Sequence, residues 1–329
     1  MKNKYLIFLL SLVLSVSIFA KSSFEITALG VYGGVIDGNL TSYLIRSSDE
    51  NSYLALDAGT LLPGIQKGIE LKSFDNIVLP ESETLTKDGY ILKQSIKGYF
   101  ISHGHLDHIS GLIISSTDDH SKNIYALQSV ITVISENYFN WKAWPNFSTS
   151  GEGFKLGKYT YKVLEPGKEM PIEGTKLFGQ VFPLSHSNYE SSMLLIRNNK
   201  DYFAYFGDTG PDAVEKSQNL DVIWKALGPK IKDKKLKGMI IEVSYPNGVL
   251  DKDLFGHFTP DWLIRELQNL EKYSGGKGSL KGFNVIISHV KPSLNKNIDT
   301  RALIREQLKS GNTLGINFTM LDQGKKAEF

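Results

Sequence analysis

Three histidines and one aspartate lie close together in the segment ISHGHLDHISGLIISS, residues 101–116. They are His103, His105, Asp107 and His108, and their imidazole and carboxylate groups are ligands that zinc and similar metals accept. The apolar run before them predicts a buried strand, and the run after them predicts the start of a helix. Side chains on such a strand-to-helix turn can converge on one point. A solvated histidine-rich loop is the alternative, but the segment favours a metal site, for which we expect two ions.

The remaining histidines of the chain are His120, His186, His257 and His289. The last three each follow a short apolar stretch that ends in a polar turn, and Asp208 ends the similar stretch DYFAYFGD. Taken alone, each of these residues would more often be structural, but a site for two metals needs ligands from several strand ends. We therefore expect these strand-end residues to join the site. His120, in the polar segment STDDHSKN, is expected to lie in a surface loop.

The pattern HxHxDH, followed by a distant His, a GDT-type Asp and a final His, resembles the metallo-β-lactamase superfamily. Within it, HGHLDHISGLIISS resembles the signature of the class II cyclic-nucleotide phosphodiesterases, except that Thr117 stands where that signature closes with Ala or Pro. The segments YLALDAGT, FNWKAWPNF and SHSNYESSMLLI extend the resemblance over nearly the whole mature chain. Periodicity alone predicts only an α/β or α+β protein. The resemblance implies a single α+β domain with an αββα sandwich and a site along one edge.

The resemblance also implies two groups of three ligands and one shared carboxylate. The groups are His103, His105 and His186, then Asp107, His108 and His289, with Asp208 as the bridge beside a hydroxide. Asp57, in ALDAG, is implied to orient the metal-binding loop rather than to ligate. Zinc is the expected metal for a set rich in His and without Cys, and Mn or Fe are the alternatives.

Hydrolysis of a 3′,5′-cyclic phosphate to a 5′-nucleotide expels a sugar alkoxide, which needs a proton. The resemblance implies that Glu242, in IIEVSYP, and His257, in GHFTPDWL, supply it, with Asp107 as a further catalytic residue. A strand-end carboxylate and a helix-capping histidine are the structural alternatives. We expect a phosphodiesterase that acts on cAMP, with cGMP left open. Another hydrolase of the superfamily, such as a lactonase or sulfatase, and a non-catalytic periplasmic binding protein are the rival functions.

Residues 1–20 pair Lys2 and Lys4 with an uncharged apolar run, which is the pattern of a signal peptide. We expect the domain to occupy residues 21–329 and to be periplasmic or secreted, without stable membrane association after cleavage. A retained N-terminal anchor is the alternative. The absence of Cys suits an oxidising compartment.

The chain has 37 basic and 35 acidic residues, and removal of the two leader lysines makes these numbers equal. A neutral mature chain is a poor partner for long nucleic acids, whose binding depends on many phosphate contacts. The lysine-rich segment WKALGPKIKDKKLKG, residues 224–238, is expected to be a solvated connecting face. The expected partner is therefore a small cyclic nucleotide.

Overall fold

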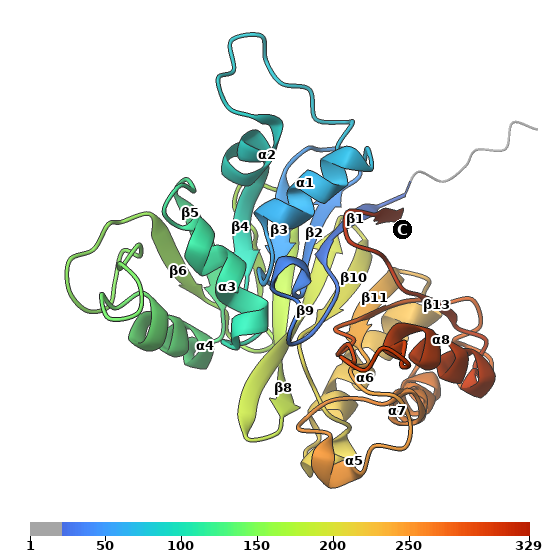
Figure 1. Ribbon diagram of the computed structural model, residues 1–329. Helices are drawn as coiled ribbons and strands as arrows, with labels where there is room; N and C mark the ends of the chain where they lie inside the picture. The colour runs from blue at the N-terminus through green and yellow to red at the C-terminus, as the bar shows by residue number, and fades with distance from the viewer. Residues whose placement is uncertain (1–21) are drawn as a thin grey trace, which may run out of the picture.

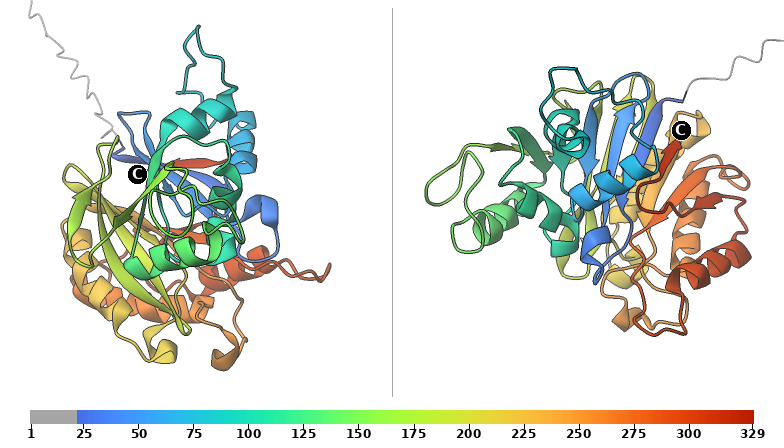
Figure 2. Two further views of the ribbon diagram at one scale, coloured as in Figure 1. Left: turned by 90° about the vertical axis from the view of Figure 1, so that its left-hand side faces the viewer. Right: turned by 45° about the horizontal axis from the view of Figure 1, so that its top comes forward.

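The computed structural model describes residues 22–329, so the predicted signal peptide lies outside the described residues. Two seven-stranded sheets pack face to face, and helices cover their outer faces (Figures 1 and 2). This is the predicted αββα sandwich. None of the helices in the described range has the length and apolar composition that a membrane-spanning segment requires.

The strands of the first sheet lie in the order β14 (Lys326–Glu328), β1 (Phe24–Gly30), β2 (Ser42–Ser47), β3 (Tyr53–Leu56), β4 (Ile96–Phe100), β5 (Lys122–Ala126) and β6 (Tyr159–Val163). Those of the second lie in the order β13 (Asn317–Thr319), β12 (Asn284–Ser288), β11 (Leu236–Glu242), β10 (Asp201–Phe206), β9 (Tyr189–Asn198), β8 (Phe178–His186) and β7 (Glu169–Pro171). The α-helices are α1 (Leu62–Glu70), α2 (Lys87–Tyr90), α3 (Leu106–Ser115), α4 (Gln128–Val133), α5 (Asp212–Glu215), α6 (Asn219–Lys232), α7 (Pro260–Tyr273) and α8 (Thr300–Gly311).

Strands β10, β11, β12 and β13 are parallel, and the two inner ones, β11 and β12, are largely apolar and buried. Parallel strands buried on both faces have this composition. Along β11 and β12, Ile240 and Ile286 face the core between the sheets, while Ile241 and Ile287 face the helices. The chain leaves β10, β11 and β12 at the same edge of the sheet. That edge therefore receives Asp208, Glu242 and His289.

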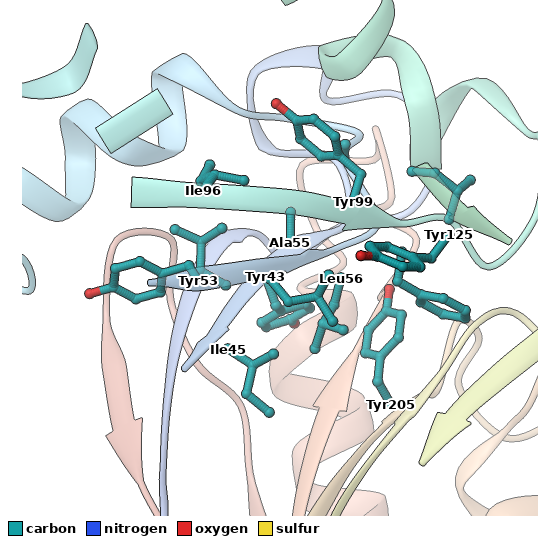
Figure 3. Packing of buried hydrophobic residues seen from close by; sticks show 14 of the residues in the cluster. Tyr43, Ile45, Tyr53, Ala55, Leu56, Ile96, Tyr99, Tyr125 and Tyr205 are labelled. Carbon is teal, nitrogen blue, oxygen red and sulfur yellow. The ribbon is translucent and has the colours of Figure 1, made fainter. Parts of the chain in front are cut away.

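Tyrosines tie the two sheets together just beneath that edge. Tyr43 of β2 donates to Ser288 Oγ of β12 over 2.7 Å, and Tyr205 of β10 donates to Asp57 Oδ2, after β3, over 2.6 Å. Figure 3 shows Tyr43 and Tyr205 close together between the sheets, and their ring centroids are 6.3 Å apart. Buried hydroxyls need hydrogen-bond partners. These two find them in the opposite sheet, so the relative position of the sheets is defined at the edge where the functional residues gather.

The lysine-rich segment, expected to be a solvated connecting face, is largely helix α6 rather than a connection, but its lysines face solvent as expected. One side of α6 is buried, with Trp224 fully covered and its Nε1 donating to Glu266 Oε2 of α7 over 3.0 Å. The lysines lie on the outer side of α6, in the turn that follows or, for Lys237, at the start of β11, and Lys225 pairs with Asp221 at 2.7 Å.

Candidate metal centre and active site

All seven predicted ligands lie close together at the shared edge of the sheets. The turn after β4 and the first turn of α3 carry His103, His105, Asp107 and His108, while His186 ends β8, Asp208 follows β10 and His289 follows β12. His105 and Asp107 are partly exposed, and the other five side chains are buried. His120 is exposed, lies next to Gln94 and belongs to none of the clusters of potential metal ligands among the described residues.

The first group consists of three imidazoles whose nitrogens face one another. Nδ1 of His105 lies 3.0 Å from Nε2 of His103 and 3.3 Å from Nε2 of His186. A tetrahedral zinc with bonds of about 2.0–2.1 Å separates its nitrogen ligands by about 3.3 Å. These three nitrogens therefore have the spacing of ligands that share one ion.

The second group combines imidazoles with carboxylates. Nε2 of His289 lies 3.1 Å from Asp107 Oδ2 and 3.1 Å from Asp208 Oδ2. Nε2 of His108 lies 3.3 Å from Asp208 Oδ1, yet it is fully buried and makes no hydrogen bond to any described residue. An unpaired buried ring nitrogen costs free energy unless something binds it. A cation at this point would satisfy it.

Asp208 lies between the two groups. Its Oδ2 is 3.8 Å from Nε2 of both His103 and His186, on the side away from His108. The carboxylate is only 2% exposed. Its position is the one that a carboxylate shared by two ions requires.

The outer nitrogens of the ligand rings are held by hydrogen bonds. His108 donates from Nδ1 to Asp57 Oδ2 over 2.7 Å, and His186 donates from Nδ1 to the carbonyl of Gly256 over 2.8 Å. Nδ1 of His103 lies 3.0 Å from Ser102 Oγ. Such outer partners fix ring orientation and leave the inner nitrogen available to a metal.

Asp57 performs the orienting role implied by the sequence resemblance. Its carboxylate accepts from the backbone N–H and the hydroxyl of Ser102, both at 2.7 Å, as well as from His108 and Tyr205. Its φ of 53° lies in the left-handed region, which is strained for a non-glycine residue. The sequence did not identify Ser102, although its place directly before His103 was a usable signal.

The charges of the clustered ligand residues favour cation binding. Burial lowers the pKa of His186 to about 4 and holds the pKa of His103 well below its usual value, so both rings are neutral and can act as ligands. Burial opposes ionisation of Asp208, but the neighbouring His108 and His289 outweigh it and hold the pKa of Asp208 well below its usual range. Burial also disfavours a charged His108, yet the surrounding carboxylates, Asp208 first, raise its pKa well above the usual value. A metal would replace that proton.

His257 and Glu242 form a buried pair beside this centre. His257 donates from Nδ1 to Glu242 Oε1 over 2.7 Å, and its ring centroid lies 4.7 Å from that of His186. Burial opposes ionisation of Glu242, but His257 outweighs it and lowers the pKa of the carboxyl group. The N-cap of α7 is Thr259, whose Oγ1 accepts the N–H of Trp262. His257 is therefore not the helix cap.

Comparisons with known proteins agree with this geometry. A model of the family described as class-II cAMP phosphodiesterases matches residues 22–324. A probable 3′,5′-cyclic-nucleotide phosphodiesterase of Yersinia pestis is 53% identical over 96% of this chain and 93% of its own length. A 3′,5′-cyclic-nucleotide phosphodiesterase of Aliivibrio fischeri is 49% identical over 93% of both chains.

The fold is shared with solved structures. The crystal structure of unliganded yeast PDE1 superposes with a TM-score of 0.78 at 24% identity, covering 94% of this chain and all of that one (100%). A metallo-β-lactamase fold protein of Bacillus subtilis superposes with a TM-score of 0.61 at 14% identity, covering 94% of this chain and 100% of that one. The sequence matches show that the chain belongs to the class-II cAMP phosphodiesterases, and the structural matches show that it has the metallo-β-lactamase fold.

Proposed function

We propose that this protein is an exported phosphodiesterase that uses two metal ions to hydrolyse 3′,5′-cyclic nucleotides, cAMP among them, to 5′-nucleotides. The observation that carries the proposal is a set of five overlapping clusters of potential metal-binding residues at one edge of the sheets. The His257–Glu242 pair lies among them. The relatives that cover nearly the whole chain are named for this activity.

The metal ligands in this proposal are the two ligand groups described above and the carboxylate of Asp208 between them. One ion would be held by His103, His105 and His186, the other would be held by Asp107, His108 and His289, and Asp208 would be available to both. Bound divalent ions would lower the pKa of water to near neutrality and stabilise charge on the phosphate oxygens. Zinc suits the nitrogen-rich first group, and the carboxylates of the second group accept Mn or Fe as well.

His257 supplies the proton for the leaving group. Its Nδ1–H is held by Glu242 Oε1 at 2.7 Å, so the proton that it delivers to the departing 3′-oxygen comes from Nε2. Glu242 keeps the ring oriented through this hydrogen bond. Because both side chains are at least 97% buried, competing proton transfer to bulk water is restricted.

A substrate panel tests the function. Metal-replete protein should hydrolyse cAMP, and cGMP should be assayed beside it, together with a lactone, an aryl sulfate and a short RNA. We expect the cyclic nucleotides to turn over far faster than the RNA, because a neutral mature chain releases few counterions from a polyanion. Preferred cleavage of the lactone or the sulfate would contradict the proposal.

Export is supported by the leader pattern of residues 1–20 and by the absence of Cys. The enzyme would then remove extracellular or periplasmic cyclic nucleotide. N-terminal sequencing of the natively expressed protein should begin near Lys21. A soluble cytosolic protein that retains Met1 would contradict export without affecting the assignment of the reaction.

A further inference from the structure

Ser244 lies where the proton-donor pair meets the metal centre. It follows β11, is fully buried, and its Oγ is 2.6 Å from Glu242 Oε2 and 2.9 Å from Nδ1 of His289. The same oxygen is 3.2 Å from Nδ1 of His257. One hydroxyl therefore contacts the carboxylate and both neighbouring histidines.

The directions of these hydrogen bonds follow from the number of protons. A serine hydroxyl has one proton to donate and two lone pairs. Two acceptors compete for that proton, Glu242 Oε2 at 2.6 Å and the backbone carbonyl of His289 at 3.0 Å. The carboxylate is closer, and a charge-assisted bond is the stronger one, so the proton of Ser244 points to Glu242 Oε2. The hydroxyl oxygen must then accept, and the proton that it accepts is the one on Nδ1 of His289.

This direction decides the tautomer of His289. With its proton on Nδ1, the ring presents a bare Nε2 to Asp107 and Asp208, whose Oδ2 atoms each lie 3.1 Å away. A lone pair facing two carboxylates is repelled unless a cation lies between them. The opposite tautomer would instead donate from Nε2 to the carboxylates and could not bind metal.

The same pattern of carboxylate, serine and histidine occurs around Asp57. Ser102 donates to Asp57 Oδ2 over 2.7 Å and lies 3.0 Å from Nδ1 of His103, while Asp57 holds His108 directly. Each carboxylate thus anchors one histidine itself and a second through a serine. In the second pair, Glu242 holds His257 directly and Ser244 connects it to His289.

We propose that Ser244 is a positioning residue that keeps His289 in its metal-binding tautomer and holds Glu242 against His257. The inference deepens the proposed function and rests on it for the role of His257. Its metal-binding half does not depend on the substrate.

Zinc titration of the metal-free protein against a chromophoric chelator tests that half. In Ser244→Ala we expect one of the two binding steps to weaken by about 10–100-fold, the usual cost of losing an outer partner of a ligand. The other step should stay within about threefold of the parent. Ser274→Ala is the matched control, because among residues 22–329 its buried hydroxyl bonds only the carbonyl of Leu270, in α7. Ser244→Thr, which keeps the hydroxyl, should restore the weakened step.

The role of Ser244 in holding Glu242 against His257 is tested by comparing two substrates with different leaving groups. At saturating metal, the ratio of kcat on cAMP to kcat on a p-nitrophenyl phosphodiester should fall about 10-fold in Ser244→Ala, less than complete loss of a general acid costs. Should this variant not fold, Ser244→Cys carries the same expectations, because sulfur is a weak acceptor.

Zinc affinities and a kcat ratio equal to those of Ser274→Ala would overturn the proposal, whatever the melting temperature. Failure of the parent protein to hydrolyse any cyclic nucleotide would sink the proposed function instead, and the zinc titration would still decide the tautomer role of Ser244.

Discussion

Asp208 is the carboxylate that faces both ligand groups. Its Oδ1 is 3.3 Å from Nε2 of His108, and its Oδ2 is 3.8 Å from Nε2 of His103. We expect Asp208→Ala to release both ions and to lose activity with them, at a cost in affinity above the 10–100-fold typical of an outer partner. Metal analysis after gel filtration measures this. Circular dichroism should remain that of the parent protein, and a variant that kept one ion and full activity would contradict the shared role.

His257 separates proton donation from metal binding. We expect His257→Ala to keep its metals and to lose about 10²–10⁴-fold in rate on cAMP. The loss should be much smaller on a p-nitrophenyl phosphodiester, since nitrophenolate leaves without a proton. Glu242→Gln should lose less than His257→Ala and in the same direction. Equal losses on both substrates would exclude the acid role, and loss of metal would make His257 a ligand.

The residues that the fold brings together could be predicted because their types are rare and their spacing is informative. HxHxDH identified four of them, and the remaining histidines and Asp208 stood at the ends of apolar runs. Ser102 and Ser244 were not predicted, although Ser102 directly precedes His103, because serine is common and its role here depends on which carboxylate lies next to it. That neighbour is supplied by tertiary structure, through Asp57 for Ser102 and Glu242 for Ser244.

Among the elements, α6 shows why local sequence can mislead. Gly228 and Pro229 lie inside it, and both disfavour the interior of a helix. The helix forms because its buried side, which includes Leu220, Ile223 and Trp224, packs in the core of the second sheet. Burial of three large apolar side chains contributes several kcal/mol. This exceeds the cost of about 3 kcal/mol for proline together with about 1 kcal/mol for glycine.

The loop after β1 presses on the metal centre. Gly33 donates its N–H to the carbonyl of Val290, and a Cβ at Gly33 would lie 2.3 Å from Cε1 of His289. Gly33→Ala should therefore displace the His289 ring and weaken metal binding by about 10–100-fold. Gly38→Ala is the control, because its added methyl group would meet nothing within 4 Å. Zinc titration of the two variants measures the effect, and equal affinities would contradict this account of the loop.

At the scale of the whole molecule, the ligands come from both halves of the sandwich. The segment after β4 belongs to the first sheet, while His186, Asp208 and His289 belong to the second. Bound ions would thus link the two sheets, and a ligand that binds only the folded state raises the free energy of unfolding. An ion at 1,000 times its Kd adds about 4 kcal/mol.

We therefore expect a chelator to lower the midpoint of thermal unfolding by several degrees and added zinc to restore it. Differential scanning calorimetry measures the shift. Asp208→Ala supplies the internal control, because its midpoint should respond little to either addition. An unchanged midpoint in the parent protein would mean that the ions do not contribute to holding the sheets together.

The distribution of the ligands along the chain also governs when the enzyme can acquire its metals. His103 and His289 are separated by more than half of the 329 residues, and Asp57, which contacts His108 and Ser102, comes earlier still. No nascent fragment that lacks β12 can complete the second group. Loading of the second group would consequently be a late event, possible only after nearly the whole polypeptide has left the ribosome. An ion held by the second group would then come from the compartment in which folding finishes, rather than from the one in which synthesis begins.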